Sequence, residues 1–598
     1  YSSRGVDVSS QIKNVTILGA GTMGHGIAQI FAAHGFNVWL VDVRKDALEN
    51  AKKRITESLK ERFLYGLIKE DPNTIISRIH FTQDVKDAVI NSDFVIEAVP
   101  EVLGVKKSVL KKIDKIAPSN LIIASNTSGL SISKLASFTR REDKFIGMHF
   151  LNPPLTMQLV EIIKGDNTSD ETVNIIMELT RKIGKEPVLI KKDFPGAIVN
   201  NIIGMIFLQA FWPVASNEHK VEEIDASYRF KGGFPAGPFE VMDLIGLDVI
   251  NSSFVPSMKY LIGSKFDFIA EMIKKLVNTN KLGVKTGEGF YKYPEPGVFI
   301  NQPLTRREGL KVSFVEFYAL PINSAVNLLA KEISSKEEID KAFRLGYLYP
   351  IGIFELADTI GIDVIVNKLN ELKNKRGISL YEPHEILKEM VKDGRLGIKV
   401  GEGFYKYSVK KEQRNKIAIR REEENLWLIF NDLLVSNRDL INELENILLE
   451  DTKDVKMIIF DVDNTSIRSS LPQKIDKDAV NRYKELVETL RQMKIPKIAI
   501  LKGRFFNESL LFSLLADIRI ADIYSTFGFL GYPKEEFSEI RGNLVPFIGL
   551  TNSNELLMNE RVIGSIEAFD IGLVNMVGFT DELEFLARSY ARKMSARS

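Results

Sequence analysis

Three glycines spaced as G-x-G-x-x-G lie near the start of the sequence, at Gly19, Gly21 and Gly24. An apolar, β-branched run precedes them, and a pattern typical of a helix follows them to about Ala33. In such a segment glycine permits a tight turn, lets the backbone approach a pyrophosphate and lets the helix pack closely on the strand. The free N–H groups at the helix N-terminus would bind the phosphates. The pattern therefore predicts a dinucleotide site, and a glycine-rich turn without a ligand is the alternative.

A carboxylate ends the next apolar run, at Asp42. An acidic residue roughly 20 residues beyond the glycines is suited to bind the ribose hydroxyls of an adenosine. It would also repel a 2′-phosphate, which favours NAD over NADP. Arg44 follows two residues later and could accommodate that phosphate, so NADP stays open as the alternative.

The composition excludes several classes of function. The chain has 598 residues, too many for one core, so several domains are expected. Its 80 basic and 79 acidic residues give no reason to expect nucleic acid or a membrane surface as partner. Without cysteine, thiol chemistry is excluded, and the six scattered histidines predict no metal site. No apolar run reaches the roughly 18 residues of a membrane helix, and no signal segment is apparent, so we expect a cytoplasmic protein.

Alternating strands and helices must hold these side chains in place. Apolar runs at 94–101, 121–130 and 144–154 predict strands, and a charged helix is expected from 47 to about 69. This alternation predicts a mostly parallel sheet covered on both faces, with ligands bound beyond the carboxyl ends of its strands. The polar residues that fall at such ends are Glu97, Glu101, Asn126, Ser128 and His149.

The region from about residue 193 to about residue 408 is expected to be helical and contains an internal repeat. Residues 229–249 recur at 344–364, and residues 281–293 recur at 395–407, with offsets of 115 and 114 residues. These offsets predict a tandem duplication of one helical domain rather than a solenoid.

The two copies differ at a position that could carry chemistry. Asn200 lies near the start of the first copy, whereas the aligned residue of the second copy is Val315. We therefore expect one active copy and one structural copy. A charged stretch at 410–424 predicts a linker, beyond which an α/β pattern returns with a helix near 478–493.

Taken in order, nine motifs of this sequence resemble the 3-hydroxyacyl-CoA dehydrogenases. They are GAGTMGHGIA, Asp42, EAVPE, SNTS, GMHFLNP, LVEII, DFPGAIVN, GPFE and GEGFYKY. The resemblance covers about residues 13–300 and extends to about 408 through the repeat. It implies an NAD-dependent (S)-3-hydroxyacyl-CoA dehydrogenase that acts on acyl-CoA thioesters, in β-oxidation or short-chain acyl-CoA metabolism.

The same resemblance implies roles for individual residues. His149 would take the proton of the 3-hydroxyl group, which suits an imidazole with a pKa near 6.5, and Glu161 would hold the imidazole. Ser128 and Asn200 would bind the substrate oxygen and orient the thioester, although a buried core histidine is the alternative for His149 alone. The implied cofactor contacts are Gly19, Gly21, Thr22, Met23, Gly24, Asp42, Glu101, Lys106, Asn126, Asn152 and Lys285, and Ser58 would contact coenzyme A. Asn201 stands where the family usually has arginine.

The last part of the chain resembles the enoyl-CoA hydratase (crotonase) fold. Hydration needs two carboxylates on one water and two N–H donors on the thioester oxygen. The residues found there are Asn507, Glu508 and Ser509 for the expected glycines, Leu511 and Gly531 for the glutamates, and IRSSLPQK at 467–474 for the second oxyanion loop. We therefore expect no hydratase activity. The segment IIFDVDNTS also matches the D-x-D-x-T strand end of haloacid-dehalogenase-type phosphatases, a weaker alternative without its usual context.

The sequence thus predicts an α/β protein with four domains. They are a Rossmann-type NAD-binding domain at 1–192, two tandem helical domains at 193–300 and 301–412, and a crotonase-like α/β domain at 413–598. The second helical copy is expected to cover the first as an internal pseudo-dimer, so we expect a monomer. A bifunctional hydratase–dehydrogenase and a non-catalytic acyl-CoA-binding or scaffold protein are the alternatives.

Overall fold

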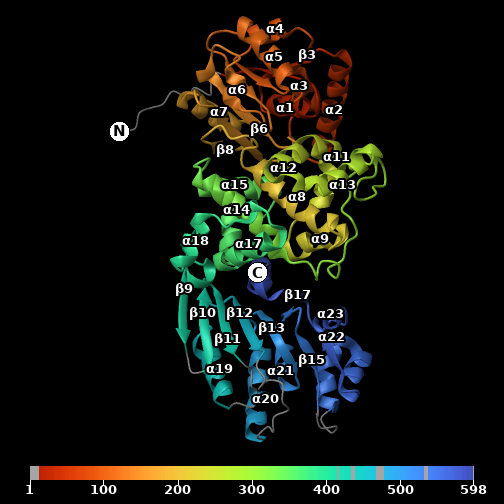
Figure 1. The fold of residues 1–598 in the computed structure, drawn as a ribbon, viewed down its shortest axis with the longest axis vertical. Helices are drawn as coiled ribbons and strands as arrows, with labels where there is room; N and C mark the ends of the chain where they lie inside the picture. The colour runs from red at the N-terminus through yellow and green to blue at the C-terminus, as the bar shows by residue number, and fades with distance from the viewer. Residues whose placement is uncertain are drawn as a thin grey trace. The chain divides into compact units, whose positions relative to one another are not determined.

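The computed structural model describes residues 12–349, 351–413, 416–431, 438–465, 477–530 and 537–596. The chain forms two compact units, one of Tyr1–Met205 with Ser324–Phe354 and the other of Ile206–Asn323 with Glu355–Ser598. Figure 1 shows the chain from its red N-terminal strands to its blue C-terminal helices. None of the helices in these described ranges is long and apolar enough to cross a membrane.

The first unit contains an eight-stranded sheet within its described residues, in the order β3-β2-β1-β4-β5-β6-β7-β8. The strands are β1 (Asn14–Leu18), β2 (Asn37–Val41), β3 (Ile79–Thr82), β4 (Phe94–Glu97), β5 (Ile122–Ser125), β6 (Phe145–Phe150), β7 (Leu159–Lys164) and β8 (Glu186–Ile190). Each neighbouring pair is parallel except β6 and β7, which are antiparallel. The mostly parallel sheet predicted from the sequence is confirmed.

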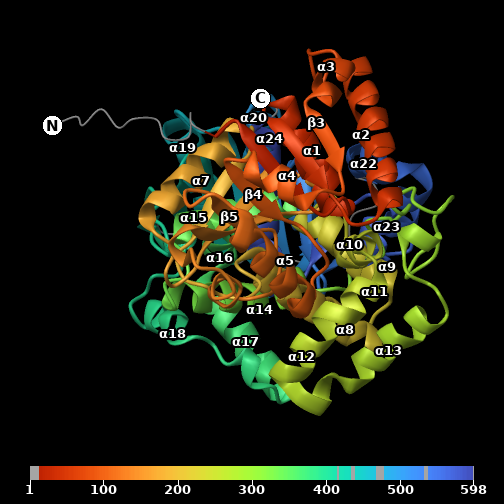
Figure 2. The ribbon, with the colours of Figure 1, turned by 90° about the horizontal axis from the view of Figure 1, so that it is seen from above.

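Helices alternate with these strands. They are α1 (Thr22–Ala33), α2 (Lys45–Leu64), α3 (Pro72–Ser77), α4 (Val85–Ile90), α5 (Leu103–Ile116), α6 (Ile132–Ala136) and α7 (Asp170–Lys182), with a 3-10 turn at Glu142–Lys144. Side chains of α1, α2, α3 and α7 share one hydrophobic core, and Figure 2 shows α1, α2 and α3 side by side. Ser169 caps α7 by accepting a hydrogen bond from Thr172 N–H, which explains where that helix starts. Helix α2 ends at Leu64, about five residues before its predicted end.

Two groups of helices follow, as the repeat predicts. The first group is α8 (Val199–Ala215), α9 (Val221–Ser227), a π-helical turn at Tyr228–Gly232, α10 (Pro238–Ile245), α11 (Leu247–Val249), a second π-helical turn at Ile250–Phe254, α12 (Val255–Ile262), and α13 (Asp267–Asn278), with 3-10 turns at Gly263–Phe266 and Val284–Thr286. The second group is α14 (Phe314–Ala330), α15 (Lys336–Tyr347), α16 (Ile353–Ile360), α17 (Ile362–Arg376) and α18 (Glu385–Lys392), with 3-10 turns at Ser379–Tyr381 and Ile398–Val400.

Hydrogen bonds in the two copies repeat along with the sequence. The buried carboxylate of Asp243 accepts a bond from the Tyr293 hydroxyl at 3.0 Å, and the equivalent Asp358 accepts one from Tyr407 at 2.9 Å. Each of these carboxylates also accepts two backbone N–H bonds from the same glycine-rich segment. A duplicated sequence has therefore kept its internal bonding in both copies.

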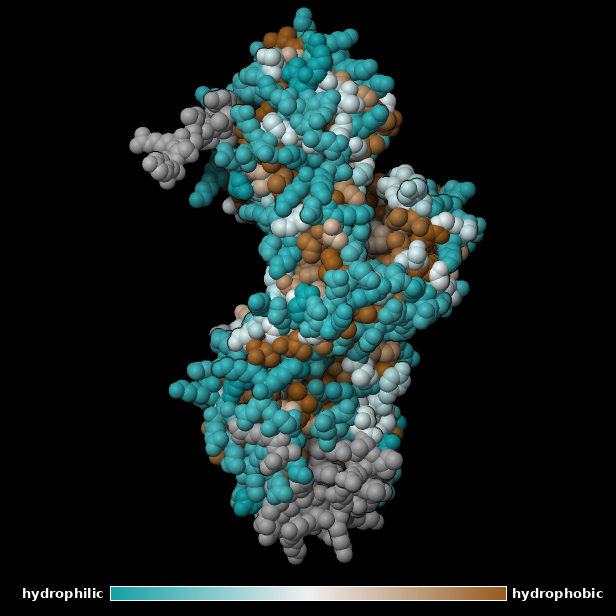
Figure 3. Space-filling model, turned by 60° about the vertical axis from the view of Figure 1, so that its left-hand side comes forward, coloured by the Kyte–Doolittle hydropathy of each residue, from teal (hydrophilic) through white to brown (hydrophobic). Residues whose placement is uncertain are grey.

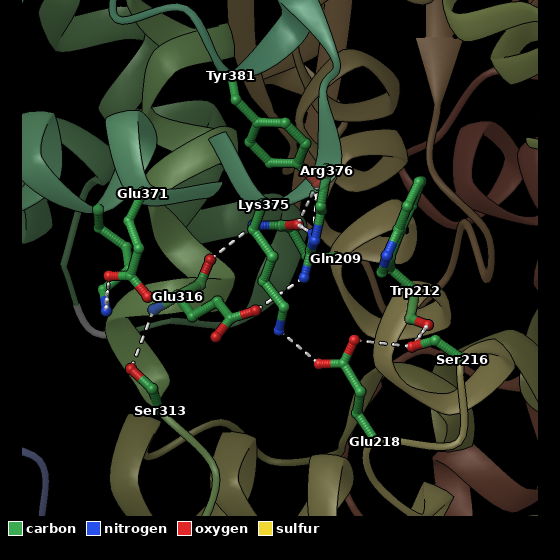
Figure 4. A network of polar contacts seen from close by, with 11 residues as sticks. Gln209, Trp212, Ser216, Glu218, Ser313, Glu316, Glu371, Lys375, Arg376 and Tyr381 are labelled. Carbon is green, nitrogen blue, oxygen red and sulfur yellow. Dashed lines mark hydrogen bonds and ion pairs between the residues drawn. The ribbon is translucent and has the colours of Figure 1, made fainter. Parts of the chain in front are cut away.

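A buried arginine joins the two copies inside the second unit (Figure 4). Arg376 of α17 donates to the side chain of Gln209 on α8 and to Glu316 of α14 at 2.7 Å. The Gln209 amide donates back to the Glu316 carbonyl at 2.6 Å, and the Arg376 guanidinium lies 5.3 Å from the Trp212 ring. Charge-assisted bonds of this kind, in a largely buried place, fix how the two copies pack together.

A second sheet begins after the helical copies. Its described strands are β9 (Val409–Gln413), β10 (Ile417–Glu422), β11 (Asn425–Asn431), β12 (Met457–Asn464), β13 (Lys497–Phe506), β14 (Ile518–Asp522), β15 (Thr526–Gly528), β16 (Val562–Gly564) and β17 (Met576–Gly578). Its helices are α19 (Arg438–Glu450), α20 (Lys477–Gln492), α21 (Glu508–Ser513), α22 (Phe537–Met558), α23 (Ser565–Asp570) and α24 (Leu583–Ser595), with a 3-10 turn at Thr580–Glu582. The path β16-β15-β13-β12-β11-β10-β9 carries β14 and β17 as a branch.

The linker predicted at 410–424 is wrong, because β9 and β10 form an antiparallel pair there. The charged residues that suggested a linker are partly buried. Arg420 lies 4.3 Å from the Trp427 ring and pairs with Glu422 at 2.9 Å, so its charge is compensated inside the sheet domain. The sheet therefore starts at Val409, four residues before the predicted boundary at 413.

Candidate active site

The glycine loop between β1 and α1 has the shape that a bound pyrophosphate needs. Gly19 has a φ of +104°, and a Cβ there would lie 2.6 Å from the Ala98 carbonyl oxygen. A Cβ on Gly24 would lie 1.8 Å from the Gly19 oxygen, so the close packing of loop and helix requires glycine. A Cβ on Gly21 would meet no described atom within 4 Å, which leaves that side of the loop open. No side chain among the described residues caps the N-terminus of α1, so its first N–H groups can bind phosphate oxygens.

Asp42 follows β2 beside this loop. Its carboxylate accepts bonds at 2.9 Å from the N–H groups of Ala20 and Arg44, which hold it at the end of the strand. The carboxylate is partly exposed, so its remaining lone pairs can accept bonds from ribose hydroxyls. The Arg44 side chain is 67% exposed and lies 3.7 Å from Asp46. These residues fit a dinucleotide without a 2′-phosphate.

His149 and Glu161 face each other directly across the antiparallel pair β6–β7. The His149 Nδ1 atom lies 2.8 Å from Glu161 Oε2, and both side chains are buried. With Glu161 ionised, Nδ1 donates to it and Nε2 keeps a free lone pair that can accept a proton. This is the geometry of an imidazole base whose tautomer is set by a carboxylate.

The other oxygen of Glu161 is held by the start of α8. Glu161 Oε1 accepts bonds from the N–H groups of Ile198 at 2.9 Å and Val199 at 3.0 Å. A helix N-terminus stabilises a negative charge, so these two N–H groups offset part of the cost of burying the Glu161 carboxylate. The strand pair β6–β7 and the start of the first helical copy are therefore bonded to each other at this carboxylate.

The loop that carries Ser128 is ordered by Glu101. One Glu101 oxygen accepts bonds at 3.1 Å from the N–H groups of Ser128 and Gly129 and a short bond from the Thr127 hydroxyl. Burial favours a raised pKa for Glu101, but the Lys106 ammonium and these donors outweigh it and hold the pKa below its usual range. Ser128 itself is exposed beyond the strand end.

Asn200 reaches the same loop from α8. Its side-chain amide lies 3.3 Å from the Ser128 carbonyl oxygen, in hydrogen-bonding geometry. The Asn126 side chain accepts a bond from the Phe150 N–H at 2.8 Å, one residue after His149. The structure therefore brings Ser128, His149, Glu161 and Asn200 to one end of the sheet, as the sequence predicts.

Comparisons with known proteins identify the family of this chain. The family described as "3-hydroxyacyl-CoA dehydrogenase, NAD binding domain" matches residues 14–194, and "3-hydroxyacyl-CoA dehydrogenase, C-terminal domain" matches residues 196–293 and again 317–407. The mitochondrial hydroxyacyl-coenzyme A dehydrogenase of Homo sapiens is 39% identical over 296 residues, which are 47% of this chain and 91% of that protein. The chain belongs to the 3-hydroxyacyl-CoA dehydrogenase family.

Other relatives point the same way. A probable 3-hydroxybutyryl-CoA dehydrogenase of Deinococcus radiodurans is 39% identical over 277 residues, 46% of this chain and 99% of that protein. A crystal structure of 3-hydroxybutyryl-CoA dehydrogenase from Escherichia coli is similar with a TM-score of 0.57 at 25% identity, covering 64% of this chain and 99% of that one. This dehydrogenase is an NAD-dependent oxidoreductase.

One implied cofactor residue of the dehydrogenase, Lys106, lies behind another, Glu101. Lys106 is buried, and its ammonium donates to Glu97 at 2.8 Å and lies 3.2 Å from Glu101. Glu97 is fully buried and also accepts a bond from the Ser125 hydroxyl at 2.6 Å. Lys106 can therefore act on the site through Glu101, which it holds in place. Sequence reasoning placed Glu97 at a strand end but gave it no role.

Two further residues with implied roles, Lys285 and Ser58, bond to other side chains in this structure. Lys285 pairs with Asp248, and the second copy repeats this pair as Lys399 with Asp363 at 2.7 Å, so the bond belongs to the duplicated fold. The Ser58 hydroxyl accepts a bond from the buried Gln29 amide at 3.0 Å.

A lysine that sequence reasoning missed anchors the loop between His149 and Glu161. Lys185 donates at 2.7 Å to the carbonyl oxygens of Pro154 and Met157, and burial together with the charge of Arg62 lowers its pKa to about 8. Asn152 lies in this loop and is exposed. Nothing local in the sequence marks Lys185, because its bonds reach back about 30 residues.

Proposed function

We propose that this chain oxidises (S)-3-hydroxyacyl-CoA to 3-oxoacyl-CoA, with His149 as the base. The observation that carries the proposal is the buried pair of His149 and Glu161, with Nε2 left free to take a proton. When NAD is bound, it supplies the hydride acceptor. Glu161 stabilises the imidazolium that forms when His149 takes the hydroxyl proton.

Ser128 and Asn200 complete the proposed site. Ser128 lies in the loop beyond the carboxyl end of β5 and Asn200 lies in the first turn of α8, where its amide is partly exposed and bonded to the Ser128 loop. We assign the Ser128 hydroxyl to the substrate oxygen and Asn200 to the thioester. Production of NADH on addition of 3-hydroxybutyryl-CoA and NAD tests the proposal. Purified protein that forms no NADH with short- or long-chain substrates would contradict it.

Replacing Asp42 by alanine is expected to reduce the preference for NAD over NADP by about 10- to 100-fold, because charge-assisted hydrogen bonds to the ribose disappear together with the repulsion of a 2′-phosphate. The ratio of kcat/KM for the two cofactors measures this. Asp46→Ala, which removes an exposed acid from the neighbouring helix, is the control and should leave the ratio unchanged. A wild-type enzyme that prefers NADP would show that Arg44 determines the choice instead.

The two helical copies are proposed to form a pseudo-dimer within one chain. Tyr347 of the second copy bonds to Val199 of the first, and Gly232, the residue equivalent to Tyr347, faces Phe314, the residue equivalent to Val199. Such reciprocal contacts are the mark of a two-fold relation, in which each half offers the same patch to the other. These contacts between the described residues are all made within one chain, so the proposed pseudo-dimer forms without a partner chain.

We accordingly expect a monomer in dilute solution. On the face drawn in Figure 3, hydrophobic residues form separate patches within a mainly hydrophilic surface. Light scattering coupled to size exclusion should give a mass near 67.5 kDa at micromolar concentration. A stable dimer held through α8 or α14, located by cross-linking, would overturn the proposal.

We propose an NAD-binding domain to 192, helical copies at 193–300 and 301–408, and a crotonase-like domain from Val409 that has lost hydration. Its strands β12 and β13 pair in parallel, and a short helix, α21, follows β13 where the oxyanion loop is expected.

A further inference from the structure

The second helical copy covers the edge of the NAD-binding sheet. β8 is the last strand of that sheet, and its backbone is bonded to the segment that leads into α15. Lys191 N–H donates to the Ile333 carbonyl at 2.7 Å, and the Ser334 hydroxyl donates to the Leu189 carbonyl at 2.6 Å. An edge strand with satisfied backbone groups is held firmly, so α15 has a fixed position on the catalytic unit.

The far end of α15 reaches the support of the catalytic pair. The Tyr347 hydroxyl donates a hydrogen bond of 2.6 Å to the carbonyl oxygen of Val199. A Cβ on Gly346 would lie 3.0 Å from a Val199 methyl group and 3.5 Å from the Leu151 side chain, two residues after His149. Both residues of the second copy therefore contact the backbone segments that carry the proposed catalytic groups.

Val199 connects Tyr347 to two functional side chains. The Val199 N–H donates to Glu161, and the Val199 carbonyl belongs to the peptide unit whose nitrogen is that of Asn200. The hydrogen bond from Tyr347 to this carbonyl fixes the rotation of the first turn of α8 about the helix axis. That rotation determines where the N–H groups that bond to Glu161 lie and in which direction the Asn200 side chain points.

The duplication offers an internal comparison. The first copy has Gly232 where the second has Tyr347, so the aligned side chain of the first copy has no hydroxyl group. The second copy also has buried Val315 in place of Asn200. At this aligned position the hydroxyl therefore belongs to the copy that faces the proposed active site.

We propose that Tyr347, supplied by the second helical copy, is a positioning residue for the His149–Glu161 pair and for Asn200. The second copy then has a part in the reaction that goes beyond covering an apolar face. This inference rests on the proposed function, since it assigns Tyr347 to the support of that site. Tyr347 touches neither substrate nor cofactor in this role.

Tyr347→Phe tests the proposal, because it removes one hydroxyl and keeps the ring that packs 4.8 Å from Phe343. We expect kcat to fall by between about twofold and tenfold, the factor that corresponds to one neutral hydrogen bond. The KM for NAD should stay unchanged, because the glycine loop and Asp42 are untouched. Tyr407→Phe is the matched control: it removes an equivalent hydroxyl bond in the second copy, to Asp358, and should leave kcat unchanged at a similar thermal midpoint.

A double substitution separates positioning from stability. In a background that combines Glu161→Gln with Asn200→Ala, both side chains that Tyr347 helps to place are gone, so adding Tyr347→Phe should change kcat by less than about twofold. A wild-type kcat in the single Tyr347→Phe variant, or an equal loss of kcat in both backgrounds, would overturn the inference. Full activity of Glu161→Gln alone would instead overturn the proposed function.

Discussion

Replacing His149 by glutamine is expected to lower kcat by about 10²- to 10⁴-fold, the usual contribution of a general base. Glutamine keeps a polar side chain of similar reach, but it cannot accept and hold a proton at neutral pH. The affinity for NADH, measured by fluorescence titration, should stay near that of the wild type, since the glycine loop and Asp42 lie on other strands.

Two further variants make this result interpretable. His80→Gln replaces an exposed histidine that stacks on Trp39 at 5.0 Å, and it should leave kcat unchanged. Glu161→Gln should also lower kcat, because the amide cannot stabilise an imidazolium as a carboxylate does. Near-normal turnover in His149→Gln would contradict the assignment of His149 as the base, even if the variant still bound NADH.

Much of the dinucleotide site could be predicted from the sequence because it is local. Gly19, Gly24 and Asp42 lie within one strand–helix–strand segment. Steric contacts require glycine at the first two positions, and the loop N–H group bonds to the carboxylate at the third. The pairing of His149 with Glu161 is implied by the family resemblance, and in the structure two adjacent antiparallel strands carry them face to face.

Contacts between distant segments could not be predicted in this way. The Tyr347 hydroxyl bonds to Val199, which lies 148 residues earlier in the chain. Lys106 is buried behind Glu101, a position that depends on the folded sheet. The charged run near Arg420 has the composition of a linker, because burial of paired charges leaves no local pattern in the sequence. Hydrophobic periodicity predicts elements, whereas buried polar pairs depend on the tertiary fold.

The C-terminal domain is attached to the helical copies by a buried ion pair and by hydrogen bonds. The Glu582 carboxylate accepts bonds from the buried Lys231 ammonium and from the Phe314 N–H at 2.8 Å, so it joins both copies. Arg588 of α24 bonds to Glu422 at 2.8 Å and to the Thr359 carbonyl at 2.9 Å. A domain held in this way supports the helical copies whether or not it has chemistry of its own.

The crotonase register predicted from the sequence places the groups for hydration at positions where the described residues are of another type or already bonded. The Asn507 N–H, at the first of the expected glycines, donates to the Gly528 carbonyl at 3.2 Å, and its side chain bonds to both backbone groups of Leu530. Leu511 lies in α21 where a glutamate is expected. Gly531 and the loop at 467–474 lie outside the described residues.

We therefore expect crotonyl-CoA to be hydrated at a rate near background. Losing one oxyanion donor costs about 10²- to 10³-fold, and losing the acid–base groups costs roughly another 10²- to 10⁴-fold. The loss of crotonyl-CoA absorbance without NAD measures hydration, with NADH formation from 3-hydroxybutyryl-CoA as the positive control on the same sample. Glu508, in the first turn of α21, is the nearest described carboxylate to Leu511 along the chain. Hydration at a rate comparable to the dehydrogenase step, and abolished by Glu508→Gln, would show that this carboxylate replaces the missing glutamates and that the chain is bifunctional.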